Sequence, residues 1–269
     1  MRVHMPEGHT VHRIAKDHGR LLVGQPVRVS SPQGRFTADA QRVDGLVLNK
    51  LEAVGKHLFY WWDTGDIGHV HLGLFGKFRV SSGADSPPPI GEVRMRMQTT
   101  LATIDLAGPT ECSIGTPHDR ELILCRLGPD PLRRDARAQV AIDRIRSSKQ
   151  PIGALLLDQR VLCGVGNVYR AEALFVTGIH PARTGQEIDE SEARSLWNTI
   201  VAMLRKGVRD NRIITVDRTL VKLTKSGPLR RGEATYVYHR DRCLICNTPI
   251  QTIELGGRPC YFCPVCQPR

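Results

Sequence analysis

The stretch LLLDQRVLCGVGNVYRAEALF, residues 155–175, decides more about the fold than any other part of the chain. Gly164 and Gly166 bracket a tight turn, and Asn167 stands where the N-cap of a helix belongs. The residues VYRAEALF then predict a helix that continues to about Gly178. An exposed helix start presents free backbone N–H groups and the positive end of the helix dipole, so it favours a bound phosphate. A helix hairpin capped by asparagine, without a ligand, is the alternative.

Helical periodicity continues on both sides of this stretch. Residues 133–146 and 151–158 are predicted helices, and 189–208 places its apolar residues on one helical face. The segment RLGPDPL (126–132), with one glycine and two prolines, predicts a domain boundary.

Towards the N-terminus the pattern changes to that of a β-protein. Residues 8–22 predict a helix, whereas 25–125 contain short apolar runs broken by glycine, proline and aspartate. Repeated short strands with turn signals are typical of a β-sandwich or barrel. Cys112, Cys125 and Cys163 lie among apolar neighbours, and we expect each to be a small buried core residue.

The C-terminal tail has the cysteine spacing of a metal site. CLIC (243–246) and CPVC (263–266) are separated by sixteen residues. Two residues between cysteines let both thiolates face one ion. The tail therefore predicts one structural Zn²⁺ with four thiolate ligands, and disulfides are the alternative. The predicted ligands are Cys243, Cys246, Cys263 and Cys266.

The segment GGRPCYF (256–262) is expected to form the turn and strand between the two cysteine pairs. Arg258 would project from this hairpin, where a guanidinium suits a bidentate phosphate contact as well as it suits a solvated loop. Cys260 is expected to be a spectator thiol.

The charge balance favours a polyanionic partner. The chain of 269 residues has a formal net charge of +11, and residues 205–240 carry ten basic side chains against three acidic ones. Nucleic acid is the commonest polyanion, although a merely basic soluble protein would have the same balance. No apolar run reaches the roughly 18 residues of a membrane span, and no secretory signal is visible. We therefore expect a cytoplasmic protein that does not bind membranes.

Several motifs together resemble the formamidopyrimidine-DNA glycosylase and endonuclease VIII family. They are MPEGHTVHR (5–13), GKHL (55–58), LGPDPL (127–132), LLDQRVLCGVGNVYRAE (156–172) and the C-x2-C…GGRPCYFCPVCQ tail, in family order and over nearly the whole chain. The resemblance implies a multidomain α+β fold. A β-sandwich domain with a leading helix would occupy 1–126, a helix–two-turns–helix domain 127–235 and a zinc β-hairpin finger 236–269.

The resemblance also implies a bifunctional DNA glycosylase and AP lyase of base excision repair. Its substrate would be DNA with oxidised bases or abasic sites, and its nucleophile the amine of an N-terminal proline, here Pro6. An α-amino group titrates near neutral pH, so part of it is unprotonated and nucleophilic. Glu7 would transfer protons, Lys56 would bind a phosphate beside the lesion, and Asn167 and Arg258 would bind the phosphates around the extruded nucleotide.

Without the resemblance, Pro6 is a helix-start proline, Glu7 a first-turn acid and Lys56 a solvated lysine. Five residues, MRVHM, stand before Pro6 in the sequence, and they would make its nitrogen a tertiary amide without an available lone pair. We therefore expect translation to start at Met5, with removal of that methionine. The alternative is a catalytically silent homologue that binds damaged DNA. An RNA-binding zinc-ribbon protein would leave the Pro-Glu opening and GKHL unexplained.

The lesion class rests on a few positions. Leu74 and Phe75 in HLGLFGKF (71–78) are candidate wedges that fill the gap left by an extruded base, or else a buried strand pair. An apolar–aromatic pair and the opening Pro-Glu-Gly resemble the endonuclease VIII branch, which implies oxidised pyrimidines. Thr10 stands where the family usually has glutamate, and a lesion-capping loop is expected within 218–235. We expect a monomer associated with the nucleoid.

Overall fold

The computed structural model describes residues 6–83, 87–217, 219 and 233–269. The chain forms two compact units, Met1–Arg126 and Leu127–Arg269, and each has its own hydrophobic core. We call them unit 1 and unit 2. The finer division of the second half at residues 235 and 236 stays a prediction.

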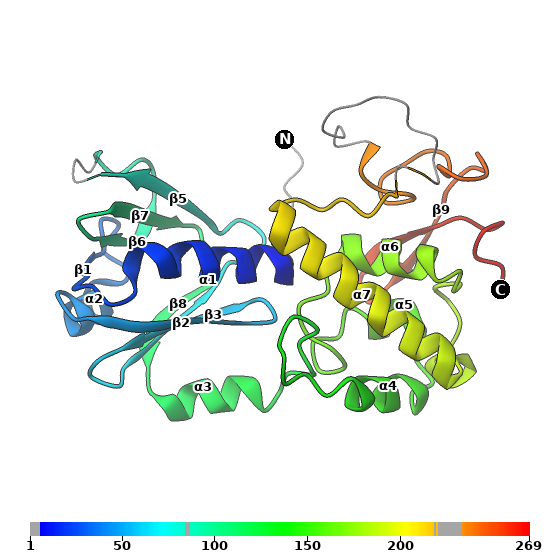
Figure 1. The fold of residues 1–269 in the computed structure, drawn as a ribbon, viewed down its shortest axis with the longest axis horizontal. Coiled ribbons are helices and arrows are strands. Elements are labelled where there is room, and N and C mark those ends of the chain that lie inside the picture. The colour runs from blue at the N-terminus through cyan, green and yellow to red at the C-terminus, as the bar shows by residue number, and fades with distance from the viewer. Residues whose placement is uncertain (1–5, 84–86, 218, 220–232) are drawn as a thin grey trace. The chain divides into compact units, whose positions relative to one another are not determined.

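Unit 1 consists of two four-stranded antiparallel sheets and short helices (Figure 1). Its elements are α1 (Gly8–Leu22), β1 (Arg28–Ser30), α2 (Thr37–Val43), β2 (Leu48–Val54), β3 (His57–Trp62), β4 (Ile67–His71), β5 (Lys77–Ser82), β6 (Val93–Gln98), β7 (Ala102–Ala107), β8 (Glu111–Gly115) and α3 (Pro117–Leu124). The strand orders are β1-β6-β7-β5 and β2-β3-β4-β8.

The core of unit 1 lies between the two sheets. Leu58 and Val70 from one sheet and Met97 and Ile104 from the other are buried in a single apolar cluster. Side chains alternate between the faces of a strand, so each sheet contributes every second residue to this core. Helix α1 packs on β2 and β3 and adds Val11 to the same cluster.

Unit 2 is helical and ends in a two-stranded hairpin. Its elements are α4 (Ala138–Arg146), α5 (Ile152–Leu155), α6 (Asn167–Val176), the 3-10 helix η1 (Gly185–Glu187), α7 (Glu190–Asp210), β9 (Gln251–Leu255) and β10 (Arg258–Phe262). Helix α7 packs against α4 and α6, and α6 also packs against β10 (Figure 1). The hairpin turn is Gly256–Gly257, both with positive φ, as a tight two-residue turn requires.

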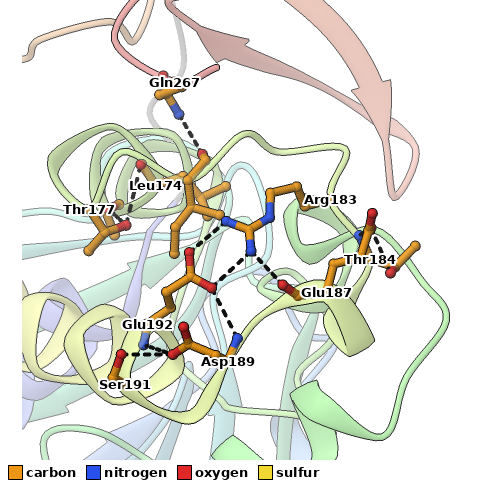
Figure 2. Close-up of polar contacts among 11 residues, drawn as sticks. Leu174, Thr177, Arg183, Thr184, Glu187, Asp189, Ser191, Glu192 and Gln267 are labelled. Atoms are coloured by element: carbon orange, nitrogen blue, oxygen red, sulfur yellow. Dashed lines mark hydrogen bonds and ion pairs between the residues drawn. The ribbon is translucent and has the colours of Figure 1, made fainter. Parts of the chain in front are cut away.

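The loop between α6 and α7 is fixed by polar contacts (Figure 2). Asp189 caps α7 by accepting from the backbone N–H of Glu192, whose carboxylate accepts in return from the backbone N–H of Asp189. Arg183 donates to both carboxylate oxygens of Glu192, at 2.6 and 2.8 Å. Gln267, near the end of the chain, donates to the Ile179 carbonyl at 2.9 Å. The segment after the hairpin is therefore attached to the loop that follows α6.

The predicted fold class is confirmed, because the sheets with a leading helix, the helical region and a cysteine-bearing hairpin occur in the predicted order. Two helix boundaries were wrong. Helix α4 starts at Ala138 rather than 133. Asp130 accepts from the backbone N–H of Leu132 through its side chain, at 2.8 Å, and from that of Arg133 through its carbonyl, at 3.1 Å, and such a local turn competes with a helix. Helix α5 covers only Ile152–Leu155, not 151–158.

Two other expectations need correction. Residues 25–125 contain α2 and α3 in addition to strands, and α3 begins with a capping box between Thr116 and Asp119. Cys125 is exposed at the end of α3 and Cys112 is partly buried, so only Cys163 is the fully buried thiol expected of all three. Among the described residues, no helix is long and apolar enough to cross a membrane.

Candidate functional site

In unit 1, Pro6 and Glu7 lead directly into helix α1. The carbonyl of Glu7 accepts from the backbone N–H groups of Thr10, at 2.9 Å, and Val11, at 3.3 Å, so Glu7 is the N-cap residue. Its side chain forms no capping bond and is only 1% exposed. A carboxyl group is thus held away from bulk water next to the half-buried Pro6.

Thr10 lies in the first turn of α1. Its hydroxyl is 3.2 Å from Nε2 of His9. Burial lowers the pKa of His9 to about 4, so the imidazole is neutral at physiological pH. His9 and Thr10 are therefore both uncharged at physiological pH.

Lys56 lies in the turn between β2 and β3, beside a cluster of histidines. His57 Nδ1 is 2.9 Å from His69 Nε2, and the ring of His57 is 4.8 Å from that of His71. Burial, followed by the neighbouring histidines and the cations Arg126 and Lys56, lowers the pKa of His57 to about 3. Burial also lowers the pKa of His69 to about 4 and that of His71. These rings are neutral next to Lys56.

Leu74 and Phe75 form the tip of the turn between β4 and β5. They are 46% and 70% exposed, so they are not a buried strand pair. Two glycines shape this turn. Gly73 has a φ of +63°, and a Cβ at Gly76 would lie 2.3 Å from the Leu72 carbonyl. This tight turn leaves the large apolar side chains of Leu74 and Phe75 exposed at its tip.

In unit 2, Asn167 and Arg258 are brought together by the packing of α6 on β10. The N-cap of α6 is Gly166, in extended backbone conformation, and Asn167 is the first helical residue, which corrects our assignment by one position. The Asn167 side chain does not cap the helix. It donates instead to the carbonyl of Pro259, the residue after Arg258, at 3.1 Å.

Two charged residues of α6 were missed by the sequence reasoning. Arg170 and Glu172 are fully buried. Glu172 accepts from the Thr215 hydroxyl and from the backbone N–H groups of Tyr236, Val237 and Tyr238, the latter three at 2.7 to 2.9 Å. Burial raises the pKa of Glu172, and these donors oppose the rise. The sequence did contain a signal for these two buried charges, because Arg170 and Glu172 interrupt the otherwise apolar run VYRAEALF.

The four tail cysteines converge. Their sulfur atoms lie within 4.8 Å of one another, with Cys246 Sγ 3.4 Å from Cys263 Sγ and 3.5 Å from Cys266 Sγ. Tetrahedral thiolates around one ion at about 2.3 Å would be about 3.8 Å apart, whereas a disulfide needs about 2.0 Å. The cluster therefore fits a metal ion and not disulfides. Cys260 is buried in the helical core, outside the cluster.

The predicted lesion-capping segment, 218–235, lies mostly outside the described residues.

Comparisons with known proteins identify the family. The model of the formamidopyrimidine-DNA glycosylase N-terminal domain matches residues 5–110, and that of the formamidopyrimidine-DNA glycosylase H2TH domain matches 127–218. The protein "Endonuclease 8 1" of Mycobacterium tuberculosis is 46% identical, covering 98% of this chain and 100% of that protein. The formamidopyrimidine-DNA glycosylase of Geobacter sulfurreducens is 29% identical, covering 98% of each chain.

A solved structure shows the same fold. The Lactococcus lactis Fpg protein in complex with DNA containing an abasic site has a TM-score of 0.80 at 22% identity, covering 98% of this chain and 100% of that one. The helix–two-turns–helix domain implied by the resemblance is thus matched by both a family model and a structure. With both family models in order along the chain and a near full-length relative at 46% identity, this chain belongs to the formamidopyrimidine-DNA glycosylase and endonuclease VIII family of base-excision repair glycosylases.

Proposed function

We propose that the chain is a bifunctional glycosylase and AP lyase that removes oxidised pyrimidines from DNA through a Schiff base at Pro6. The observation that carries the proposal is the position of Pro6 directly before Glu7, whose carboxyl group is 1% exposed at the start of α1. A carboxyl group in such a place can exchange a proton with a sugar oxygen without competition from bulk water.

The amine of Pro6 attacks the sugar C1′, the bond from C1′ to the damaged base breaks, and the base leaves with a proton. Glu7 then protonates the ring oxygen, the bond from C1′ to that oxygen breaks as the sugar opens, and the nitrogen and C1′ become an iminium ion. The iminium acidifies the C2′ proton, so its removal expels the 3′ phosphate by β-elimination, and a second, δ-elimination expels the 5′ phosphate. Water hydrolyses the remaining iminium and restores the amine.

This chemistry requires a free secondary amine. As long as residues precede Pro6, its nitrogen is an amide, so the active form is one in which Pro6 is the first residue. If MRVHM stays attached to Pro6, the chain is instead a catalytically silent homologue that binds damaged DNA, which is the second candidate.

Phosphate binding is assigned to three donors. Lys56 lies beside histidines whose pKa values are lowered by burial, so the positive charge comes from the lysine and not from these rings. Asn167 begins α6, where backbone N–H groups and the helix dipole favour an anion. Arg258 is the first residue of β10 and directly precedes Pro259, whose carbonyl accepts from the Asn167 side chain. The exposed Leu74 and Phe75 serve as wedges for the gap left by the extruded base.

We assign the cysteine cluster to one structural zinc ion, because four thiolates leave no open coordination position for catalysis. The ion would keep the short hairpin folded. The substrate class follows the resemblance to the endonuclease VIII branch and the 46% identity to a protein named Endonuclease 8 1. Solved structures of Lactococcus lactis Fpg with DNA containing an abasic site support an abasic DNA partner. We further propose a monomer that acts at the nucleoid.

The test is a cleavage assay on duplex DNA with one oxidised pyrimidine, using protein whose first residue is Pro6. The proposal expects a 3′-phosphate and a 5′-phosphate at the gap, the products of two eliminations. Glu7→Gln should abolish excision yet keep binding to an abasic-site analogue. Intact DNA with wild-type protein that still binds the analogue would instead support the silent homologue.

A further inference from the structure

We propose that Arg170 is a positioning residue for DNA binding. It fixes which end of the Asn167 amide faces outward and where the hairpin backbone carrying Arg258 lies. The inference rests on the proposed function, in which Asn167 and Arg258 bind phosphate.

Arg170 connects several elements of unit 2 from a fully buried position. One guanidinium nitrogen donates to the carbonyls of Gly153, at 3.1 Å, and Leu255, at 2.8 Å. The other donates to the carbonyls of Arg258, at 3.3 Å, and Pro259, at 3.0 Å, and to Oδ1 of Asn167. One side chain therefore joins the start of α6 to α5 and to both strands of the hairpin.

The contact with Asn167 selects one orientation of its amide. A guanidinium only donates hydrogen bonds, so the atom facing it must be the amide oxygen. The amide nitrogen donates one of its two hydrogens to the Pro259 carbonyl, which also accepts from Arg170. A phosphate oxygen only accepts, so the nitrogen is the end that can bind it. Without Arg170 the amide can turn its oxygen towards the phosphate, which is repulsive.

The same guanidinium fixes the main chain at Arg258. Its bonds to the carbonyls of Arg258 and Pro259 hold the first two residues of β10 against α6. The Arg258 side chain therefore starts from a fixed point one residue away from the Asn167 contact. Arg170 thus coordinates two proposed phosphate ligands that are 91 positions apart in the sequence.

The test is a double-mutant cycle on binding to duplex DNA with a tetrahydrofuran abasic analogue, measured by fluorescence anisotropy. In the wild-type background, Asn167→Ala should weaken binding about tenfold, as expected for one hydrogen bond to a charged group. In an Arg170→Met background, the same change should weaken it by less than about twofold, because the amide is already misoriented. A merely structural role of Arg170 would leave the two factors equal.

Arg183→Met is the matched control, since Arg183 makes a two-bond contact with Glu192 in the same unit (Figure 2). It should leave the tenfold effect of Asn167→Ala unchanged. If Arg170→Met does not fold, Arg170→Gln keeps a polar side chain that can present either an oxygen or an NH₂ to Asn167. In its background, Asn167→Ala should likewise weaken binding by less than about twofold.

Equal factors in the wild-type and Arg170-variant backgrounds would overturn the inference and leave the phosphate role of Asn167 intact. No effect of Asn167→Ala in the wild-type background would overturn both this inference and the proposed role of Asn167.

Discussion

Glu172→Gln should destabilise unit 2 although it changes neither the size nor the shape of the side chain. One carboxylate oxygen accepts from the N–H groups of Val237 and Tyr238, and the other from the Tyr236 N–H and the Thr215 hydroxyl. An amide replaces one of these oxygens with a donor. The Thr215 hydroxyl can rotate to accept from the new NH₂, so the favoured orientation places the NH₂ there and leaves the Tyr236 N–H unpaired.

The expected loss of stability follows from the one N–H group left unpaired and from the lost negative charge. One buried unpaired N–H costs about 1–3 kcal/mol, and the loss of charge assistance in the remaining bonds adds about 1 kcal/mol. We therefore expect the free energy of unfolding to fall by about 2–4 kcal/mol.

Guanidinium unfolding followed by the fluorescence of Trp197, the tryptophan of unit 2, measures this change. Hydrogen exchange at Tyr236–Tyr238 should accelerate in parallel. Glu190→Gln is the control, because Glu190 pairs with Arg146 and Arg194 at a half-exposed surface, where ion pairs contribute about 1 kcal/mol or less. If Glu172→Gln costs no more than Glu190→Gln, the buried carboxylate does not hold this segment as described.

Three further predictions concern the metal, one buried histidine and the nucleophile. Cys246→Ser should release the zinc ion and unfold the hairpin, and unchanged zinc content in elemental analysis would contradict the ligand assignment. His18 is buried, and burial lowers its pKa from 6.5 to about 4. The resulting stability is complete above pH 6.5 and is lost as the pH falls through the folded pKa. Between pH 7 and pH 5 the free energy of unfolding of His18→Leu should therefore fall by about 2 kcal/mol less than that of the wild type. If the melting temperatures of the two proteins fall equally over this pH range, the prediction is refuted. Pro6→Gly, in protein that begins at residue 6, should lose most excision activity while anisotropy still detects binding to abasic-analogue DNA.

The features predictable from sequence are those encoded within a short window. The C-x2-C pairs, the helix at 8–22 and the apolar face of 189–208 depend on spacing alone, and the structure places them as expected. The exposed pair Leu74 and Phe75 could not be distinguished from a buried strand pair, because exposure depends on the turn built by Gly73 and Gly76.

The contacts that sequence reasoning missed join distant segments. Glu172 binds backbone groups 64 to 66 positions away, and Arg170 binds carbonyls up to 89 positions away. Backbone acceptors and donors leave no trace in residue identity, so only the buried charge itself was visible. The histidines beside Lys56 come from two strands whose pairing register places His57 opposite His71, and local periodicity does not encode that register.

Borohydride trapping tests the central claim most directly, because it reduces an iminium to a stable covalent bond between protein and DNA. The substrate is duplex DNA with an oxidised pyrimidine or an abasic site. Protein that keeps MRVHM before Pro6 is compared with protein that begins at Pro6. We predict a covalent adduct only with the second form, attached through the Pro6 nitrogen in peptide mass spectra. Absence of an adduct with either form, while both still bind the damaged DNA, would contradict the account and leave a protein that recognises lesions without excising them.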